Sequence, residues 1–183
     1  MNTETISKTR FGKIFVNLVA VAMESQIRYH FLGPKKILQN VDNLCGQNVL
    51  EIGCGTGFFT LQLSERIGNQ GTLFAMDLLS ESVEEVTKKV KAAKLLNVRV
   101  IKGDALNTNL ESESFDTIIL FGVIPAPMVP LDQILKEMHR LLKPGGILAV
   151  WPSIPLIIPR MILKSGLFSF ENKRKGVSNF KRN

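Results

Sequence analysis

A glycine-rich segment in the first third of the chain is the part of the sequence best suited to chemistry. The apolar run Val49–Ile52 leads into Gly53, Gly55 and Gly57, and Glu51 lies two residues before the first glycine. Glycines at a strand end let the chain turn sharply and let a ligand approach the backbone closely. The spacing is G-x-G-x-G rather than the G-x-G-x-x-G of dinucleotide-binding loops, and no Gly-Lys-Ser/Thr of a P-loop is present. A carboxylate here would repel a pyrophosphate but suits an ammonium group. The segment therefore predicts a ligand with a cationic amino group and little or no phosphate.

Two further acidic residues follow predicted strands. Asp77 lies 20 residues after Gly57, and Asp104 follows the run Val98–Lys102. An acid at the distance of Asp77 normally accepts hydrogen bonds from ribose hydroxyls. Taken singly, both aspartates could be helix caps or turn residues, but their spacing from the glycines favours ligand binding. Together with Glu51 they fit a ligand that has an amino-acid part, a ribose and an adenine.

Strands that alternate with helices are predicted to position these residues. Apolar runs predict strands at Val49–Ile52, Thr72–Met76, Val98–Lys102, Phe115–Phe121 and Ile147–Trp151. Helical periodicity predicts helices at Phe58–Ile67, Ser80–Leu95, Leu131–Leu142 and Pro155–Lys164. We expect Ser80 to be the N-cap of its helix, with Glu81, Glu84 and Glu85 in the first turn. We expect Pro144-Gly145-Gly146 to end the helix Leu131–Leu142. This alternation is typical of a doubly wound α/β fold, a parallel sheet with helices on both faces.

The two ends of the chain are predicted to add to this core. Residues 1–40 have apolar residues at helical spacing and a short helix at Lys35–Asn40 after Gly33-Pro34, which predicts an N-terminal helical cap. Leu167–Glu171 and Val177–Lys181 could form a terminal antiparallel pair. The length of 183 residues suits one domain, and no interdomain linker is evident.

In five segments the chain resembles the class I (Rossmann-like) S-adenosylmethionine-dependent methyltransferase family. The segments are Glu51–Gly57, Asp77, Gly103–Ala105, Phe115–Ile119 and Leu141–Gly146, in the family's order and spacing. The resemblance covers nearly the whole chain. It implies one methyltransferase domain over residues 1–183, with a cap at 1–40 and a Rossmann-like core at 48–183. It also implies a mostly parallel seven-stranded sheet whose last strand is antiparallel.

The resemblance also implies roles for individual residues. Glu51 and the backbone of Gly53 and Gly55 would face the methionine part of S-adenosylmethionine. Asp77 would accept hydrogen bonds from the ribose hydroxyls, and Leu78 would pack on the adenine. The rest of the implied cofactor site comprises Cys54, Gly57, Asp104, Ala105, Phe121 and Gly122. Of these, Cys54 is interpreted as a small filler, Asp104 would bond the adenine amino group with Ala105 alongside, and Phe121 and Gly122 would lie near the transferable methyl. S-adenosylhomocysteine would be the product.

No residue stands out as a catalytic base. Tyr29 and His30 lie in the cap and could reach the site, although packing roles are the more common fate of such residues. His139 is interpreted as a surface or packing residue and Asp116 as structural. Methyl transfer needs little beyond alignment and exclusion of water. The sequence contains no Cys/His cluster for a metal.

The predicted acceptor region is apolar. After the fourth strand comes Phe121–Pro127, which lacks the Asp/Asn-Pro-Pro-Tyr/Phe of enzymes that methylate amino groups of DNA. Methylation of amino groups of DNA is therefore not expected, and no DNA partner is predicted. Apolar residues that could line an acceptor pocket, or simply fill the core, are Phe121, Val123, Ile124, Met128, Val129, Trp151, Ile154, Leu156, Ile157 and Ile158. These favour a small or lipid-like methyl acceptor.

Charge and composition narrow the remaining function classes. The net charge is +7, and residues 160–183 contain seven Lys/Arg against one acid, Glu171. Basic ends can be plain solubility charge, or can attract RNA or an anionic membrane surface, so peripheral membrane contact is one expectation. The alternative function is an RNA- or protein-binding module on the same fold with vestigial cofactor binding. Two cysteines, no signal peptide and no uninterrupted apolar span predict a cytoplasmic protein with free thiols.

Overall fold

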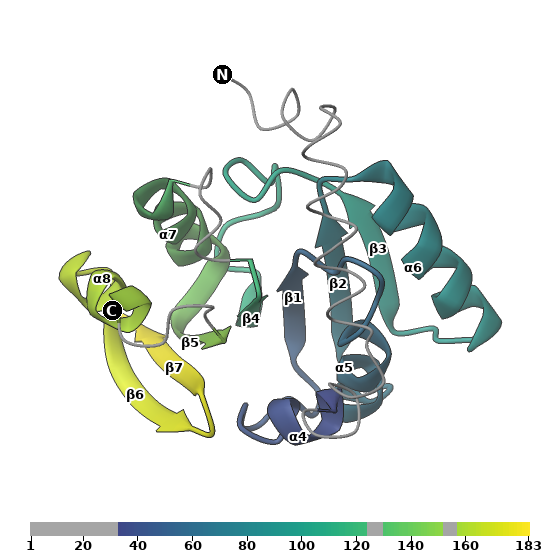
Figure 1. Ribbon diagram of the computed structural model, residues 1–183, viewed down its shortest axis with the longest axis horizontal. Coiled ribbons are helices and arrows are strands. Elements are labelled where there is room, and N and C mark those ends of the chain that lie inside the picture. Colours follow the sequence, from purple (N-terminus) through teal and green to yellow (C-terminus); the bar gives the residue numbers. More distant parts are fainter. Residues whose placement is uncertain (1–32, 124–129, 152–156) are drawn as a thin grey trace.

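A computed structural model describes residues 33–123, 130–151 and 157–183 of the chain (Figure 1). Residues 1–32, the greater part of the predicted cap, lie outside these ranges. The described strands are β1 (Asn48–Ile52), β2 (Thr72–Asp77), β3 (Val98–Lys102), β4 (Phe115–Phe121), β5 (Leu142–Trp151), β6 (Phe168–Arg174) and β7 (Val177–Arg182). The described helices are α4 (Pro34–Leu38), α5 (Thr60–Ile67), α6 (Ser80–Ala92), α7 (Leu131–Leu141) and α8 (Ile157–Lys164).

The seven strands form one mixed sheet in the order β3-β2-β1-β4-β5-β7-β6. β1 to β5 pair in parallel, whereas β7 is antiparallel to both of its neighbours, β5 and β6. The carboxyl ends of β1 to β5 therefore meet at one edge of the sheet, where open α/β sheets bind ligands. The strands confirm the predicted α/β fold and the terminal antiparallel pair.

Helices cover both faces of the sheet. α7 and α8 pack on one face, where Ile134, Met138, Ile158 and Ile162 join residues of the central strands in one apolar cluster. α4 and α5 pack on the opposite face, and α6 packs beside them over β2 and β3. Figure 1 shows α6 beside β3 at one end of the sheet, and α8 beside the β6–β7 hairpin at the other.

Strand alternation decides which side of β1 each side chain occupies. Leu50 and Ile52 belong to the cluster under α7 and α8, whereas Val49 belongs to the cluster under α4 and α5. Glu51 is two residues from Val49, so its carboxylate points to the same side as Val49, away from α7. Burial of an ionisable group in a central strand marks this position as one where its partners matter.

The predicted start of one helix was wrong in detail. Ser80 is the first residue of α6 and not its N-cap; the N-cap is Leu79, which makes no side-chain cap bond, and only Glu81 lies in the first turn. The side chain that holds the chain here is that of Asp77, whose Oδ1 accepts the Leu79 N–H at 2.9 Å. The Asp77 carboxylate at the end of β2 thus accepts a backbone hydrogen bond just before α6.

The predicted role of Pro144-Gly145-Gly146 was also wrong. α7 ends at Leu141, because Leu142 is already extended, with ψ 140°, and pairs with Phe115 of β4. The Pro-Gly-Gly segment lies within β5, where the register against β4 shifts between Phe115 and Thr117. Gly145 adopts a φ of 74° there. These residues thus form an irregularity near the start of a strand rather than a helix stop.

Candidate functional site

The glycine-rich segment links β1 to α5 and is fixed to the end of β2. The N–H groups of Gly53 and Cys54 both donate to the Met76 carbonyl, at 2.8 and 3.0 Å. Gly57 N–H donates to the Cys54 carbonyl at 2.8 Å and closes the turn. The loop therefore has a defined shape before any ligand is considered.

All three of its glycines have a positive φ, which favours glycine, and Gly53 and Gly55 differ in what surrounds them. Gly53 has a φ of 72°, and a Cβ at this position would meet Cγ2 of Val123 at 2.7 Å. Gly55 has a φ of 54°, but a Cβ there would meet nothing within 4 Å. Gly53 thus permits the close approach of the loop to the residues after β4, whereas Gly55 turns its backbone toward open space that a ligand can occupy.

Asp77 joins the loop to the end of β2. Its Oδ2 accepts the Gly55 N–H at 2.9 Å, and its Oδ1 accepts the Leu79 N–H at 2.9 Å. Burial raises the pKa of this carboxyl, and its backbone hydrogen bonds oppose that rise. Each carboxylate oxygen has two lone pairs, so both can accept a further hydrogen bond from a ligand.

Asp104 has a comparable position after β3. Its Oδ1 accepts the Leu106 N–H at 2.9 Å, and an isolated bridge pairs Asp104 with Asn107. Gly103 packs so closely on Met76 that an added Cβ would lie 2.9 Å from the methyl group of that side chain. The turn Gly103–Asn107 is thereby held against the end of β2, next to Asp77.

A cavity of about 120 Å³ lies at these strand ends. Five predicted cofactor residues line it: Gly53, Asp77, Leu78, Asp104 and Ala105. Ile52, Met76, Gly103 and Leu106, which also line it, were not among the predicted site residues, and Val123 was predicted only as one of the apolar residues that could line an acceptor pocket. Ile52, Met76 and Gly103 flank the predicted residues directly, so the strand ends gave a usable signal for them. For Val123 the sequence offered none beyond a place in the apolar run after β4.

Glu51 lies beneath the loop and does not line the cavity. Its side chain is buried, and Thr60 Oγ1 donates a hydrogen bond of 2.7 Å to its Oε2. Burial raises the pKa of Glu51 to about 8, with the charge of Asp77 adding to that effect and the Thr60 bond opposing it. The carboxyl is therefore mostly protonated at neutral pH in the absence of a nearby cation.

The other loop residues pack in the core around Glu51. Cys54 is buried with Val86 and Val90 of α6, and burial together with the charges of Glu51 and Asp77 raises the pKa of its thiol. Gly57 faces the same helix: a Cβ there would lie 3.3 Å from Val86 Cγ2. Cys54 is thus an inert filler in this structure, because the thiol rather than the reactive thiolate is favoured.

Phe121 and Gly122 end β4 beside an aromatic cluster. The Phe121 ring makes edge contacts with Phe59 and Trp151 at centroid distances of 5.2 and 6.3 Å, and Gly122 N–H donates to the Trp151 carbonyl. Neither residue lines the cavity. Their predicted place near a transferable methyl group stays a prediction.

The predicted acceptor and catalytic residues are mostly outside the described residues. The residues that lie outside the described ranges are Tyr29, His30, Ile124, Met128, Val129, Ile154 and Leu156. Ile158 is buried in the apolar cluster of α7 and α8, while Ile157 is exposed. His139 packs edge-on against Phe168 at 5.8 Å, and Asp116 accepts bonds from Asn48 N–H and Lys143 Nζ. Within the described ranges no group of three or more His, Cys, Asp or Glu is arranged to hold a metal ion.

The segment after Asp104 is anchored to α7 by a charged pair. Glu137 accepts the N–H and the hydroxyl of Thr108 at 3.0 and 2.7 Å and pairs with Arg140 at 2.7 Å. Arg140 in turn donates to the Leu110 carbonyl and to Ser112. The hydrogen bond from Arg140 is the main reason that the pKa of Glu137 falls to about 2. This network fixes the segment that supplies one wall of the cavity.

The lining fits an adenosine group. Ile52, Met76 and Leu106 offer apolar surface for a flat base, and the carboxylates of Asp77 and Asp104 can accept hydrogen bonds from ribose hydroxyls and an exocyclic amine. Gly55, in the same loop as the lining residue Gly53, leaves open space for a further part of the ligand. A mixed sheet with its seventh strand antiparallel and inserted beside β5, and a G-x-G-x-G loop after β1, together define the class I methyltransferase fold.

The comparisons with known proteins confirm this class. The family model described as a methyltransferase domain matches residues 49–146, more than half of the chain, so the chain belongs to the class I S-adenosylmethionine-dependent methyltransferase family. A demethylmenaquinone methyltransferase of Staphylococcus epidermidis is 36% identical over 132 residues, covering 69% of this chain and 53% of that protein. One from Geobacillus stearothermophilus is 34% identical over 143 residues, covering 75% of this chain and 60% of that protein. The chain thus spans a little over half the length of these curated relatives.

The solved structures agree on the fold. A SAM-dependent methyltransferase from Aquifex aeolicus superposes with a TM-score of 0.77 at 23% identity and covers 90% of this chain and 97% of that one. A putative S-adenosyl-L-methionine-dependent methyltransferase from Methanococcus maripaludis gives a TM-score of 0.73 at 16% identity. At such identities the likeness concerns the arrangement of the elements.

Proposed function

We propose that this chain is an S-adenosylmethionine-dependent methyltransferase that acts on a small, lipid-like acceptor of the quinone class. The observation on which the proposal mainly depends is the cavity between Asp77 and Asp104, next to a loop that opens toward solvent at Gly55. Two carboxylates, an apolar cavity wall and a glycine-rich loop without a phosphate-binding motif suit a ligand that consists of a nucleoside joined to an amino acid.

In this proposal the residues of the chain bind and orient the cofactor. Asp77 accepts hydrogen bonds from the ribose hydroxyls while it still accepts the hydrogen bond from the Gly55 N–H. Asp104 accepts a hydrogen bond from the adenine amino group. Leu78 and Ala105 enclose the base, and Glu51 supplies a carboxyl under the methionine end of the loop. S-adenosylmethionine, when bound, supplies a methyl group on an already activated sulfonium. Its product would be S-adenosylhomocysteine.

The remaining task of the protein is to align the acceptor and exclude water. The apolar residues at the ends of β4 and β5 are proposed to do this, together with the cap. We keep Tyr29 and His30 as candidates for polar groups that contact the acceptor. We also infer that the cap at residues 1–40 and the core at 48–183 form one domain.

The quinone class is suggested by the curated relatives. Both of the relatives described above are named demethylmenaquinone methyltransferases. The predicted acceptor region of this chain is apolar, as a lipid-like ring would require. No described helix is long and apolar enough to span a bilayer.

Calorimetric titration of the full chain tests the proposal. S-adenosylmethionine and S-adenosylhomocysteine are expected to bind and to raise the melting temperature, because a ligand that binds only the folded state stabilises it. NADH, the matched negative probe, is expected to do neither. Transfer of a labelled methyl group from S-adenosylmethionine to a short-chain demethylmenaquinone would then establish the acceptor class. Absence of binding by either sulfur compound would overturn the proposal, and RNA binding in its place would favour the alternative of a binding module with vestigial cofactor binding.

A further inference from the structure

The exposed apolar side chains of the described residues are concentrated at one end of the sheet. Among the described residues, five large apolar side chains are exposed. Four of them, Ile157, Met161, Leu163 and Phe170, lie within a stretch of 14 residues and are 40 to 54% exposed. The fifth, Leu96, follows α6 at the opposite end. Single exposed apolar residues need no explanation, but a group of them with charged neighbours does.

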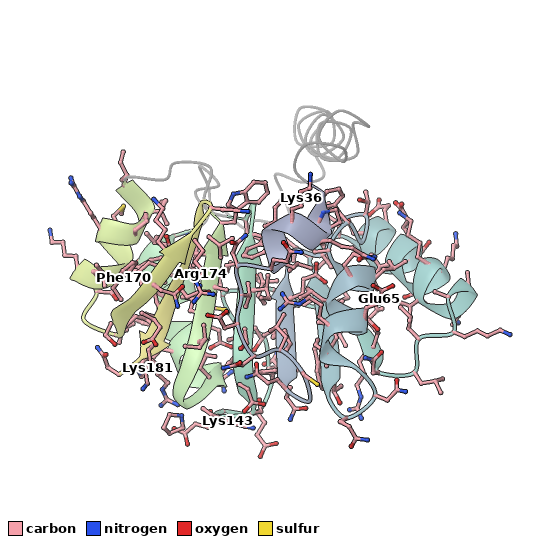
Figure 2. The ribbon with its side chains drawn as sticks, turned by 90° about the horizontal axis from the view of Figure 1, so that it is seen from below. Lys36, Glu65, Lys143, Phe170, Arg174 and Lys181 are labelled. Atoms are coloured by element: carbon pink, nitrogen blue, oxygen red, sulfur yellow. The ribbon has the colours of Figure 1, made fainter. Side chains whose placement is uncertain are left out.

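Phe170 lies on the same face of the sheet as α8, which carries the other three residues. Phe170 pairs in register with Phe180, and their rings lie 6.0 Å apart. Phe180 is buried in the same cluster as Ile158 and Ile162 of α8, so Phe170 lies on the face of the sheet that α8 covers. In Figure 2, Phe170 lies at the end of the sheet beside α8.

The exposed surface of α8 combines apolar and cationic side chains. Ile158 and Ile162 are buried against the sheet. Ile157 and Met161, four residues apart, therefore lie along one flank of the helix, and Leu163 lies along the other. Arg160 and Lys164 are exposed between the two flanks. We call Ile157, Arg160, Met161, Leu163, Lys164 and Phe170 the C-terminal patch.

The surroundings of the patch are strongly positive. Residues 157–183 contain seven Lys/Arg and one acid, Glu171. Two of the seven pair with acids elsewhere: Arg174 with Asp42 and Arg182 with Glu113. Lys173 pairs in register with Ser178, two residues from Phe180, so it lies on the same face as the patch. Arg160 and Lys164 thus lie between the apolar side chains of α8, and Lys173 lies on the same face of the sheet as Phe170.

We propose that the C-terminal patch docks the protein on an anionic phospholipid bilayer. Apolar side chains can enter the boundary between headgroups and acyl chains while Lys and Arg contact the anionic headgroups. Lys is depleted at protein–protein interfaces, whereas Lys164 lies in the middle of this patch. RNA would require stacking surfaces, and three of the four apolar residues are not aromatic.

The geometry also connects the patch with the cofactor cavity. Ile157, the first residue of α8, follows the carboxyl end of β5 by six residues. The cavity lies at the carboxyl ends of β1 to β3, at the same edge of the sheet. A bilayer bound at α8 would therefore lie beside the edge where a lipid-like acceptor has to enter. Docking itself does not depend on the proposed reaction.

Vesicle flotation of the full chain tests the proposal. The protein is expected to bind vesicles that contain 30% phosphatidylglycerol, to bind phosphatidylcholine vesicles weakly, and to lose affinity as salt rises. Arg160→Gln with Lys164→Gln should weaken binding roughly thirtyfold, since each cation near an anionic surface contributes about 1 kcal/mol. Ile157→Glu with Met161→Glu should reduce binding at least as much.

Matched variants on α6 serve as controls. Lys88→Gln with Lys91→Gln removes the same charge from exposed positions, and Leu96→Glu places an acid at the other exposed apolar site. These should retain most of the vesicle binding. All variants should keep the melting temperature and the affinity for S-adenosylmethionine, so failure of docking and failure of the proposed function are distinguishable.

Three results would overturn the proposal. The first is no preference for anionic over neutral vesicles. The second is an equal loss of binding in the α6 controls. The third is a dimer, or an RNA complex, that the patch variants abolish while vesicles remain unbound, because that result would assign the patch to a second copy of the chain or to RNA.

Discussion

The backbone N–H of Gly55 donates to Oδ2 of Asp77 at 2.9 Å, across 22 residues of sequence. The same carboxylate holds the Leu79 N–H through its other oxygen. One side chain therefore sets the positions of the glycine loop, of the end of β2 and of the start of α6. A ligand bound at Asp77 would meet a loop that is already in place, which lowers the ordering cost of binding.

Asp77→Asn should weaken S-adenosylmethionine binding by about 1–3 kcal/mol, or 5- to 150-fold. An amide has only one acceptor oxygen, so the variant cannot keep both backbone bonds and also accept from a ribose. Asp116→Asn is the matched control, because Asp116 also accepts a backbone N–H, from Asn48, but at the amino end of β4. Calorimetry should show equal affinities for Asp116→Asn and the wild type. Unchanged affinity in Asp77→Asn would contradict the ribose role.

Gly53→Ala should weaken cofactor binding at least tenfold, because its new methyl group would push Val123 out of its place in the cavity wall. Gly68→Ala at the end of α5 is the control. Gly53 and Gly68 have φ values of 72° and 69°, but only a Cβ at Gly53 meets a neighbour within 4 Å. Gly53→Ala should lose roughly 1 kcal/mol of stability because of its positive φ, and Gly68→Ala should lose more, because a φ of 69° with a ψ of −177° is a conformation that is essentially restricted to glycine. Equal affinities in the two variants would show that Val123 does not shape the site.

Glu51→Gln should remove a pH dependence of stability. The pKa of Glu51 is raised from 4.5 to about 8 in the folded protein. Its stabilising effect is therefore complete below pH 4.5 and is lost as pH rises toward 8. The difference in unfolding free energy between wild type and Glu51→Gln, measured in urea from pH 5 to 9, should fall with pH and level off above about 8. A difference that stays constant between pH 5 and 9 would show that Glu51 is already ionised in the folded state.

Binding of S-adenosylmethionine should release a proton from Glu51 near neutral pH. A cationic ammonium group close to the carboxyl favours its charged form, whereas burial alone favours the neutral one. The calorimetric enthalpy at pH 7 should then depend on the ionisation enthalpy of the buffer, with a slope of up to about one proton. In Glu51→Gln this slope should vanish. A wild-type enthalpy equal in phosphate and Tris would place the ammonium group elsewhere.

Glu137→Gln should destabilise the protein by about 2 kcal/mol, since hydrogen bonds to charged groups contribute about 1.5–3 kcal/mol each. The pKa of Glu137 is lowered from 4.5 to about 2, so its contribution is present above pH 4.5 and is lost as pH falls toward 2. Glu65→Gln removes an exposed ion pair of 3.6 Å with Lys35 on the outer surface of α5 (Figure 2). That control should cost less than about 0.5 kcal/mol. Chemical unfolding at pH 7 and pH 3 measures both.

Two strands were predictable to the residue. Val98–Lys102 and Phe115–Phe121 agree with β3 and β4 at both ends. The start of β5 was not, because Pro144 and Gly145 are local signals of a turn. What makes Leu142 extended is its pairing with Phe115, 27 residues earlier. Long-range pairing of this kind overrides local propensity and leaves no mark in the nearby sequence.

The candidate site was partly predictable for a similar reason. Asp77 and Asp104 follow strands, and the carboxyl ends of parallel strands meet at one edge, so the proximity of Asp77 and Asp104 follows from the topology. Val123 can lie in the cavity wall because Gly53 has no side chain, since a Cβ at Gly53 would lie 2.7 Å from Val123 Cγ2. The bond from Thr60 to Glu51 depends on how α5 packs over β1, and a pattern of apolar residues does not specify it.

The position of β7 also determines an order of assembly. β7 follows β6 in the chain but lies between β5 and β6 in the sheet. The two-residue turn at Lys175-Gly176, both with positive φ, lets β6 and β7 pair locally as a hairpin. During synthesis β6 has no place to join until β7 has been made. Until the hairpin docks, β5 exposes an unpaired edge that can recruit the wrong strand. Mutations that slow this docking should therefore raise aggregation of newly made chains more than they change the equilibrium stability.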